Sequence, residues 1–234
     1  MKPNLGCAVL FAILAIVVSI TVHATTLESA CFGTVANGHL ENGIKLPDDG
    51  KNFKAYSSLG VLLGRTYVHS RVAETIVAAY SALEKSASGK VFIYGETGWS
   101  GGGRFRPHKT HKNGLSVDFI VPVTDASGHS VYLPTGVSTK FGYNIDFDAN
   151  AKFEAYSIDF EAISEHLYQL HVAAEAHGAG IALVIFDPPY LPKLFATKHG
   201  QYLKDNIIFM KGKAWIRHDE HYHVDFSVPC KPNA

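Results

Sequence analysis

Hydrophobic residues recur at helical spacing in two parts of the chain. Between residues 68 and 86 they fall on one stripe, and Gly89 follows the stripe. A second stripe begins at Asp159, a residue type that caps helices, and runs to about His177, with Gly178 as a stop signal. The two stripes predict amphipathic helices, with buried positions Val72, Ile76, Tyr80 and Leu83 in the first and Phe160, Ile163, Leu167, Leu170 and Ala174 in the second.

Short apolar runs elsewhere indicate strands. Residues 90–94 and 221–228 have the length and composition of strands, and the uninterrupted run 181–186 predicts a central strand of a sheet. Residues 115–123 alternate between apolar and other positions, so Asp118 is predicted to point away from the main apolar face. That apolar face carries Leu115, Val117, Phe119 and Val121.

These helices and strands are joined mostly by loops, without a regular alternation of strand and helix. We therefore predict an α+β fold, with helices packed on a central antiparallel β-sheet and long loops between the elements. Residues 25–66 are rich in Gly, Asn and Asp and are expected to be mostly loop. Residues 124–156 are polar and aromatic and are expected to form a β-rich excursion or a long loop.

Composition limits the classes of protein to consider. The chain has 234 residues, of which 47% are hydrophobic, which is enough for the core of one domain. Lys and Arg number 21, as do Asp and Glu, so the formal net charge is zero. Because there is no basic excess, we predict no nucleic-acid partner.

The N-terminus has the features of an export signal. Lys2 precedes a nearly continuous apolar run from residue 5 to 22, and Val22-His23-Ala24 has the small-x-small pattern before a cleavage site. We predict a signal peptide over residues 1–24 and a single catalytic domain over 25–234. An uncleaved membrane anchor is the alternative, because the run is long enough to span a bilayer.

Two cysteines, Cys31 and Cys230, remain after the predicted cleavage. In an exported protein they are expected to form a disulfide. Such a bond would close a loop of about 200 residues, for which the chain-entropy model gives roughly 5 kcal/mol of stabilisation. Their spacing excludes a C-x-x-C zinc site.

The candidate chemistry lies in two histidine-rich stretches, 108–118 and 218–223. His221 and His223 are two residues apart on a predicted strand, so both imidazoles face one space. A catalytic zinc site needs three protein ligands and an open position for water. His111 and Asp118 can supply two ligands, and one histidine of the later pair can supply the third. The other histidine would then lie close to the metal-bound water and could accept its proton.

A glycine-rich loop precedes the first stretch. It lacks the Gly-Lys-Ser/Thr ending of a phosphate-binding loop. We interpret it as a flexible rim that lets the substrate backbone approach, and we expect Gly102, Gly103 and Arg104 to contact substrate.

Other enzyme classes fit less well. Two histidines and a carboxylate also describe the non-haem iron(II) oxygenases, but export and the additional histidine favour hydrolysis. The chain has no G-x-S-x-G motif of a serine hydrolase.

At these residues the chain resembles the LAS metallopeptidases, named for lysostaphin, D-alanyl-D-alanine metallopeptidases and sonic hedgehog. Within that group it is most similar to the penicillin-insensitive murein endopeptidases. The matching stretches are Gly101-Gly102-Gly103-Arg104-Phe105, His108-x-x-His111-x-x-Gly114-x-x-x-Asp118 and Trp215-x-x-His218-x-x-His221-x-His223. The family carries several disulfides, whereas this chain has cysteines for one.

The resemblance implies an α+β fold and one essential Zn²⁺. It implies that His111, Asp118 and His223 bind the zinc, that His221 is the catalytic histidine, and that His218 assists near the metal-bound water. His108 matches a histidine that can hold an additional metal in the murein endopeptidases.

The implied substrate is a peptide cross-link of peptidoglycan, cut in the periplasm. Association with the inner membrane or with a secretion machine is compatible with this expectation. The alternative is a non-catalytic wall-binding or signalling domain on the same scaffold.

Overall fold

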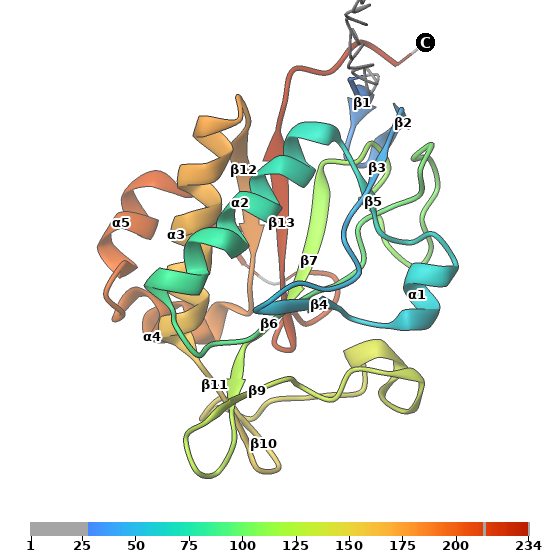
Figure 1. Cartoon of the computed structure of the whole chain (residues 1–234). Helices are drawn as coiled ribbons and strands as arrows, with labels where there is room; N and C mark the ends of the chain where they lie inside the picture. The colour runs from blue at the N-terminus through green and yellow to red at the C-terminus, as the bar shows by residue number, and fades with distance from the viewer. Residues whose placement is uncertain (1–27, 213, 234) are drawn as a thin grey trace, which may run out of the picture.

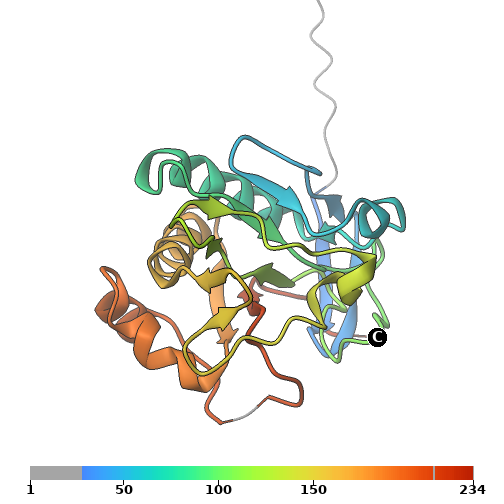
Figure 2. The same cartoon turned by 90° about the horizontal axis from the view of Figure 1, so that it is seen from below.

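A five-stranded sheet forms the centre of the protein in the computed structural model, which describes residues 28–212 and 214–233 (Figures 1 and 2). Its strand order is β12-β13-β7-β6-β4. Neighbouring strands are antiparallel except β4 and β6, which are parallel. The strands are β4 (Phe53–Ala55), β6 (Phe92–Tyr94), β7 (Ser116–Ile120), β12 (Gly180–Ile185) and β13 (His221–Ser227).

Helices α2 (Ser70–Ser86) and α3 (Phe160–Ala176) pack side by side against one face of this sheet. Asp159 caps α3 as predicted, because its carboxylate accepts a hydrogen bond from the Ala162 backbone N–H. The short helices α4 (Leu191–Phe195) and α5 (Gly200–Asn206) contact α3. The α+β class is confirmed, and the sheet is antiparallel apart from its β4 edge.

Smaller elements surround the central sheet. The excursion over residues 124–156 contributes to a four-stranded sheet of order β10-β11-β8-β9, drawn below the central sheet in Figure 1. Its strands are β8 (Val123–Thr124), β9 (Ser130–Val131), β10 (Lys152–Phe153) and β11 (Tyr156–Ile158). The 3₁₀ helix η1 (Val137–Gly142) lies between β9 and β10, and a second 3₁₀ helix, η2 (Pro188–Tyr190), follows β12.

Residues 25–66 contain more regular structure than expected. The prediction of mostly loop is wrong, because short strands and a helix form within the described part of this range. The strands at 30–34 and 37–41 contain Gly and Asn, residue types that are depleted in strands, so their pairing partners stabilise them. The elements are β1 (Ala30–Thr34), β2 (Asn37–Glu41), β3 (Ile44–Lys45, paired with β5, Tyr67–Val68), the sheet strand β4 and α1 (Ser58–Leu62).

The apolar run over 181–186 lies at an edge of the sheet and not at its centre. The outer side of β12 is nevertheless covered. Val184 donates its backbone N–H to Ile208 O at 2.8 Å, and Met210 N donates to Val184 O at 2.8 Å. An edge strand covered in this way needs apolar residues much as a central strand does.

The predicted signal peptide or anchor, residues 1–24, lies outside the described residues. Among the residues that the structure describes, no helix has the length and hydropathy needed to cross a membrane.

Candidate metal centre

The candidate site lies on the sheet face opposite α2 and α3. On β13, Tyr222, Val224 and Phe226 belong to the apolar core, so the alternate residues face the other way. The register pairs His223 with Asp118 and Asp225 with Ser116. Side chains of directly opposed residues share a face and lie close together. The register therefore brings the two histidine-rich stretches of the sequence into one cluster.

His111 is oriented by the backbone. Its ring Nδ1 lies 2.9 Å from Thr97 O, so it donates its N–H there. Nε2 is then left with a lone pair; it is buried without a hydrogen-bond partner and lies 3.3 Å from Asp118 Oδ1. Burial lowers the pKa of His111, which favours the neutral imidazole. A neutral imidazole nitrogen facing a carboxylate is the arrangement of a metal ligand.

His223 is held between two carboxylates. Its Nδ1 lies 2.8 Å from Asp118 Oδ1, and its Nε2 lies 2.8 Å from Asp225 Oδ1, which also accepts the Ser116 hydroxyl at 2.6 Å. Burial alone would lower the pKa of His223, but Asp118 and Asp225 raise it to about 10. The two carboxylates therefore stabilise positive charge at this position.

Asp118 joins the three histidines of the cluster. Its Oδ1 faces His111 and His223, and its Oδ2 lies 3.7 Å from His108 Nδ1. Burial alone would raise the pKa of Asp118, but His111 and His221 hold it well below its usual range. Ligand atoms of His108, His111 and Asp118 lie within 4.8 Å of one another. The site can therefore hold a metal ion, and imidazole nitrogens with a carboxylate oxygen suit zinc among other divalent metals.

His221 and His218 lie beside this cluster, with ring centroids 4.6 Å apart. His221 Nδ1 is 2.8 Å from Glu220 Oε1, and its Nε2 is 4.0 Å from Asp118 Oδ1. Burial alone would lower the pKa of His221, but Glu220 and Asp118 raise it. His218 Nδ1 donates to Ile216 O at 2.8 Å, and burial, followed by the charge of His221, lowers the pKa of His218 to about 4. The cluster thus offers one histidine that readily holds a proton and one that stays neutral.

A second polar network borders the cluster and was not predicted from the sequence. Glu96 accepts hydrogen bonds from Arg65 Nε, from the Tyr56 hydroxyl at 2.9 Å and from His108 Nε2 at 2.6 Å. Burial alone would raise the pKa of Glu96, but His108 and Arg65 lower it to about 2. The sequence signal that could have found Glu96 is its position two residues after the apolar run that forms strand 92–94. In the structure, Asp118 N donates to Glu96 O at 3.0 Å, which brings the two residues together.

Tyr143 joins the same network from the excursion. Its hydroxyl lies 3.0 Å from His108 Nε2 and 3.4 Å from Glu96 Oε2. Burial, Asp118 and Glu96 raise the pKa of Tyr143 above its usual range, so the phenol keeps its proton. No periodicity or motif in 124–156 pointed to this residue, because only the folded excursion brings it to the site.

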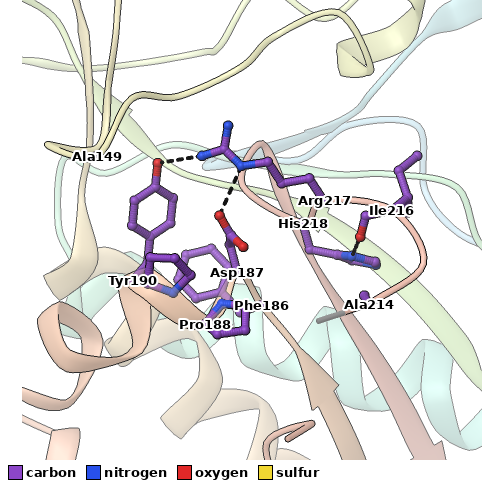
Figure 3. Close-up of a pocket in the computed structure, with 10 residues that line it drawn as sticks. Ala149, Phe186, Asp187, Pro188, Tyr190, Ala214, Ile216, Arg217 and His218 are labelled. Atoms are coloured by element: carbon purple, nitrogen blue, oxygen red, sulfur yellow. Dashed lines mark hydrogen bonds and ion pairs between the residues drawn. The ribbon is translucent and has the colours of Figure 1, made fainter. Parts of the chain in front are cut away.

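A pocket of about 270 Å³ opens over these residues. Asp118, His218, His221 and His223 line it, together with His108 and Tyr143. A larger pocket of about 730 Å³ adjoins it and shares Ile216 and His218 with it (Figure 3).

The glycine-rich loop is placed beside the cluster but does not line this pocket. A Cβ at Gly102 would lie 2.3 Å from Lys112 O, and the backbone φ there is +65°, so close packing requires glycine. Phe105, which follows Arg104, stacks on His108 and His111 with ring centroids 5.3 and 5.7 Å away. Substrate contact by Gly102, Gly103 and Arg104 stays a prediction.

The predicted disulfide between Cys31 and Cys230 is formed, with a sequence separation of 199. It joins β1 to the segment after β13, and Lys231 N donates to Cys31 O at 2.9 Å beside it. The bond therefore ties the two ends of the described chain together, and neither cysteine lines the pocket over the cluster.

Comparison with known proteins agrees with a hydrolytic role for the histidine cluster. No curated protein sequence matches the chain. The model of the penicillin-insensitive murein endopeptidases matches residues 31–234, which include every residue of the cluster and both cysteines of the disulfide. The match supports hydrolysis of peptidoglycan, and the chain belongs to the penicillin-insensitive murein endopeptidase family.

Proposed function

We propose that this protein is a zinc-dependent endopeptidase that hydrolyses peptide cross-links of peptidoglycan outside the cytoplasm. The main support is that His111 Nε2 and His223 Nδ1 both face Asp118 Oδ1, at 3.3 and 2.8 Å. Each imidazole is oriented through its other nitrogen, by Thr97 O in one case and by Asp225 in the other. Such outer contacts fix the ligand nitrogens before a metal binds.

In this proposal His111, Asp118 and His223 hold the zinc. Bound zinc lowers the pKa of a water molecule to roughly 7 and polarises a carbonyl oxygen. His221, oriented by Glu220, accepts the proton of the attacking water and passes it to the leaving amine. His218, neutral and next to His221, assists this proton transfer beside the attacking water.

Two further residues have assigned tasks. Tyr143 lines the pocket, and with substrate bound its hydroxyl exchanges the 3.4 Å contact with Glu96 Oε2 for a hydrogen bond to the carbonyl oxygen of the scissile bond as negative charge develops there. His108, bound to Glu96, lies near Asp118 Oδ2 and is the candidate for an additional metal.

The function is tested by digesting purified peptidoglycan with the protein, with and without a chelator, and identifying the products by mass spectrometry. We expect cross-linked dimers to disappear, the chelator to block this loss, and added zinc to restore it. The fragments identify the bond that is cut. If the zinc-loaded protein leaves the dimers intact, the wall-binding alternative is favoured.

The residue roles are tested by single substitutions. His223→Ala is expected to lose both metal and activity, because it removes a ligand. His221→Ala is expected to keep the metal, measured by atomic absorption, and to lose turnover. The control is His129→Ala, whose side chain is 80% exposed and outside the site. Near-normal turnover by His221→Ala would show that another group accepts the proton.

A further inference from the structure

The larger pocket adjoins the pocket over the histidine cluster and follows the end of β12. Segments 186–190 and 214–218 line it together with Ala149, and it has a volume of about 730 Å³ (Figure 3). The backbone couples it to the catalytic residues, because Asp187 N donates to His218 O at 2.9 Å. A peptide that passes His218 can therefore place a side chain in this pocket.

Most of the pocket wall is apolar. Phe186, Pro188 and Pro189 form part of it from one segment, and Ile216 and Ala214 face them from the other. Such a surface favours the methylene groups of a side chain over a hydrated polar group.

One polar group of the pocket has an unused acceptor atom. Asp187 Oδ2 accepts from Arg217 Nε at 3.0 Å, whereas Asp187 Oδ1 accepts no hydrogen bond from any residue within the described ranges. The Asp187 side chain is 13% exposed, and Asp187 is among the residues that line the pocket. The open oxygen is therefore available to a donor on a ligand.

Arg217 does not offer the pocket an equivalent site for an anion. Its Nη2 donates to Phe147 O at 2.6 Å and to the Tyr190 hydroxyl at 3.3 Å, as Figure 3 shows for the second contact. Its Nη1 lies 3.2 Å from Asp219 and 3.9 Å from Asp146. Three carboxylates thus surround one guanidinium, and the local charge favours a cation.

We propose that this pocket binds the free side chain of a diamino acid in the stem peptide: its methylene groups lie on the apolar wall, and its ammonium group donates to Asp187 Oδ1. The inference rests on the proposed function. An amide cross-link between two stem peptides requires a residue with a second amino group. In a cross-linked dimer, the strand that supplies the carbonyl group keeps its own second amino group free. That strand therefore presents the required ligand near the scissile bond.

The test uses three synthetic cross-linked peptides that differ only at this position, which carries lysine, norleucine or glutamate. Their KM values are measured with the zinc-loaded full-length protein, and their Kd values with the metal removed. We expect the lysine peptide to have KM and Kd values about 10-fold lower than the norleucine peptide, and the glutamate peptide to bind weakest. Equal values for lysine and norleucine would overturn the proposal.

The two proposals fail in different ways. If none of the peptides is hydrolysed, the endopeptidase function is contradicted, while the Kd values still decide the role of the pocket. If all three are hydrolysed with equal KM, the function stands and the pocket assignment is wrong.

A matched pair of variants tests the role of the carboxylate. Asp187→Asn keeps an oxygen that can accept from Arg217 but removes the charge, so the preference for lysine over norleucine is expected to disappear. Asp205→Asn removes the same charge from an exposed position on α5 and is expected to keep the preference. A preserved preference in a folded Asp187→Asn protein would contradict the assignment.

Discussion

At the scale of single residues, the chemistry of His111 and of His223 depends on the group that contacts the ring nitrogen facing away from Asp118. His111 donates to a neutral carbonyl, whereas His223 lies against the carboxylate of Asp225. A carboxylate partner makes an imidazole more basic and a stronger metal ligand. Both arrangements leave one nitrogen directed at Asp118, so the two histidines act together although they come from distant parts of the sequence.

Asp225→Asn is expected to weaken metal binding by about 10-fold or more, because the amide no longer carries the charge that supports His223. The measurement is zinc affinity in competition with a chelator of known strength. Asp205→Asn is the control for loss of one carboxylate. An unchanged zinc affinity in Asp225→Asn would mean that Asp225 only orients the His223 ring and that its charge does not strengthen metal binding.

Tyr143→Phe is expected to lower kcat by about 10²-fold, the usual effect of removing one donor to a developing oxyanion, with KM and zinc content unchanged. Tyr56→Phe is the matched control, because it removes a hydroxyl bonded to the same Glu96 carboxylate but does not line the pocket over the cluster. Equal losses of kcat in the two variants would indicate that both tyrosines only position Glu96.

At the scale of secondary-structure elements, β13 has two faces with different tasks. One face carries His221, His223 and Asp225, and the other carries Tyr222, which packs beneath α3. There the Tyr222 hydroxyl forms a hydrogen bond with His166 Nδ1, and His166 is fully buried among aromatic rings. This contact anchors the catalytic strand to the helix layer.

The buried His166 predicts a specific dependence of stability on pH. Burial lowers the pKa of His166 to about 3, while an imidazole in the unfolded chain has a pKa near 6.5. Between these values only the unfolded chain is protonated, so this contribution to stability is present above pH ~6.5 and is lost as the pH falls. From pH 7 to pH 5 the loss is about 2 kcal/mol.

The measurement is urea unfolding of the metal-free protein at both pH values, compared with His166→Phe. The wild-type protein is expected to lose about 2 kcal/mol more than the variant, because phenylalanine cannot be protonated. Equal losses in the two proteins would show that His166 is not held neutral in the folded state.

At the scale of the whole molecule, the fold separates stability from chemistry. The helices and the apolar side of the sheet form the core, while the histidine cluster occupies the opposite side of the sheet. The disulfide lies apart from both pockets and joins positions separated by 199 residues.

Replacing both cysteines, Cys31→Ala with Cys230→Ala, is expected to lower the free energy of unfolding by about 5 kcal/mol, because the unfolded chain regains the entropy of a very long loop. Urea unfolding measures the change, and the wild-type protein with a reductant should reproduce it. Zinc content should stay the same, since neither cysteine contacts the cluster. An unchanged free energy of unfolding would show that the bond does not constrain the unfolded chain.

The sequence by itself determined the local features of this protein. The periodicities located α2, α3, β6 and β13 closely, and the capping role of Asp159 was visible from its residue type and position. The spacing of His221 and His223 was enough to place both on one face of a strand. These predictions succeeded because helical and strand periodicity depend on neighbouring residues.

The tertiary structure decided which distant residues meet. The register that sets Asp118 opposite His223, the edge position of β12 and the strands before residue 66 all depend on pairing partners far away in the chain. The approach of Glu96 and Tyr143 to His108, and the pocket at Asp187, depend on the same pairing. Such contacts follow from the free energy of the whole fold, and hydrophobic periodicity does not record them. The expectation that Asp118 and His223 share a metal came from the family resemblance and not from a local pattern.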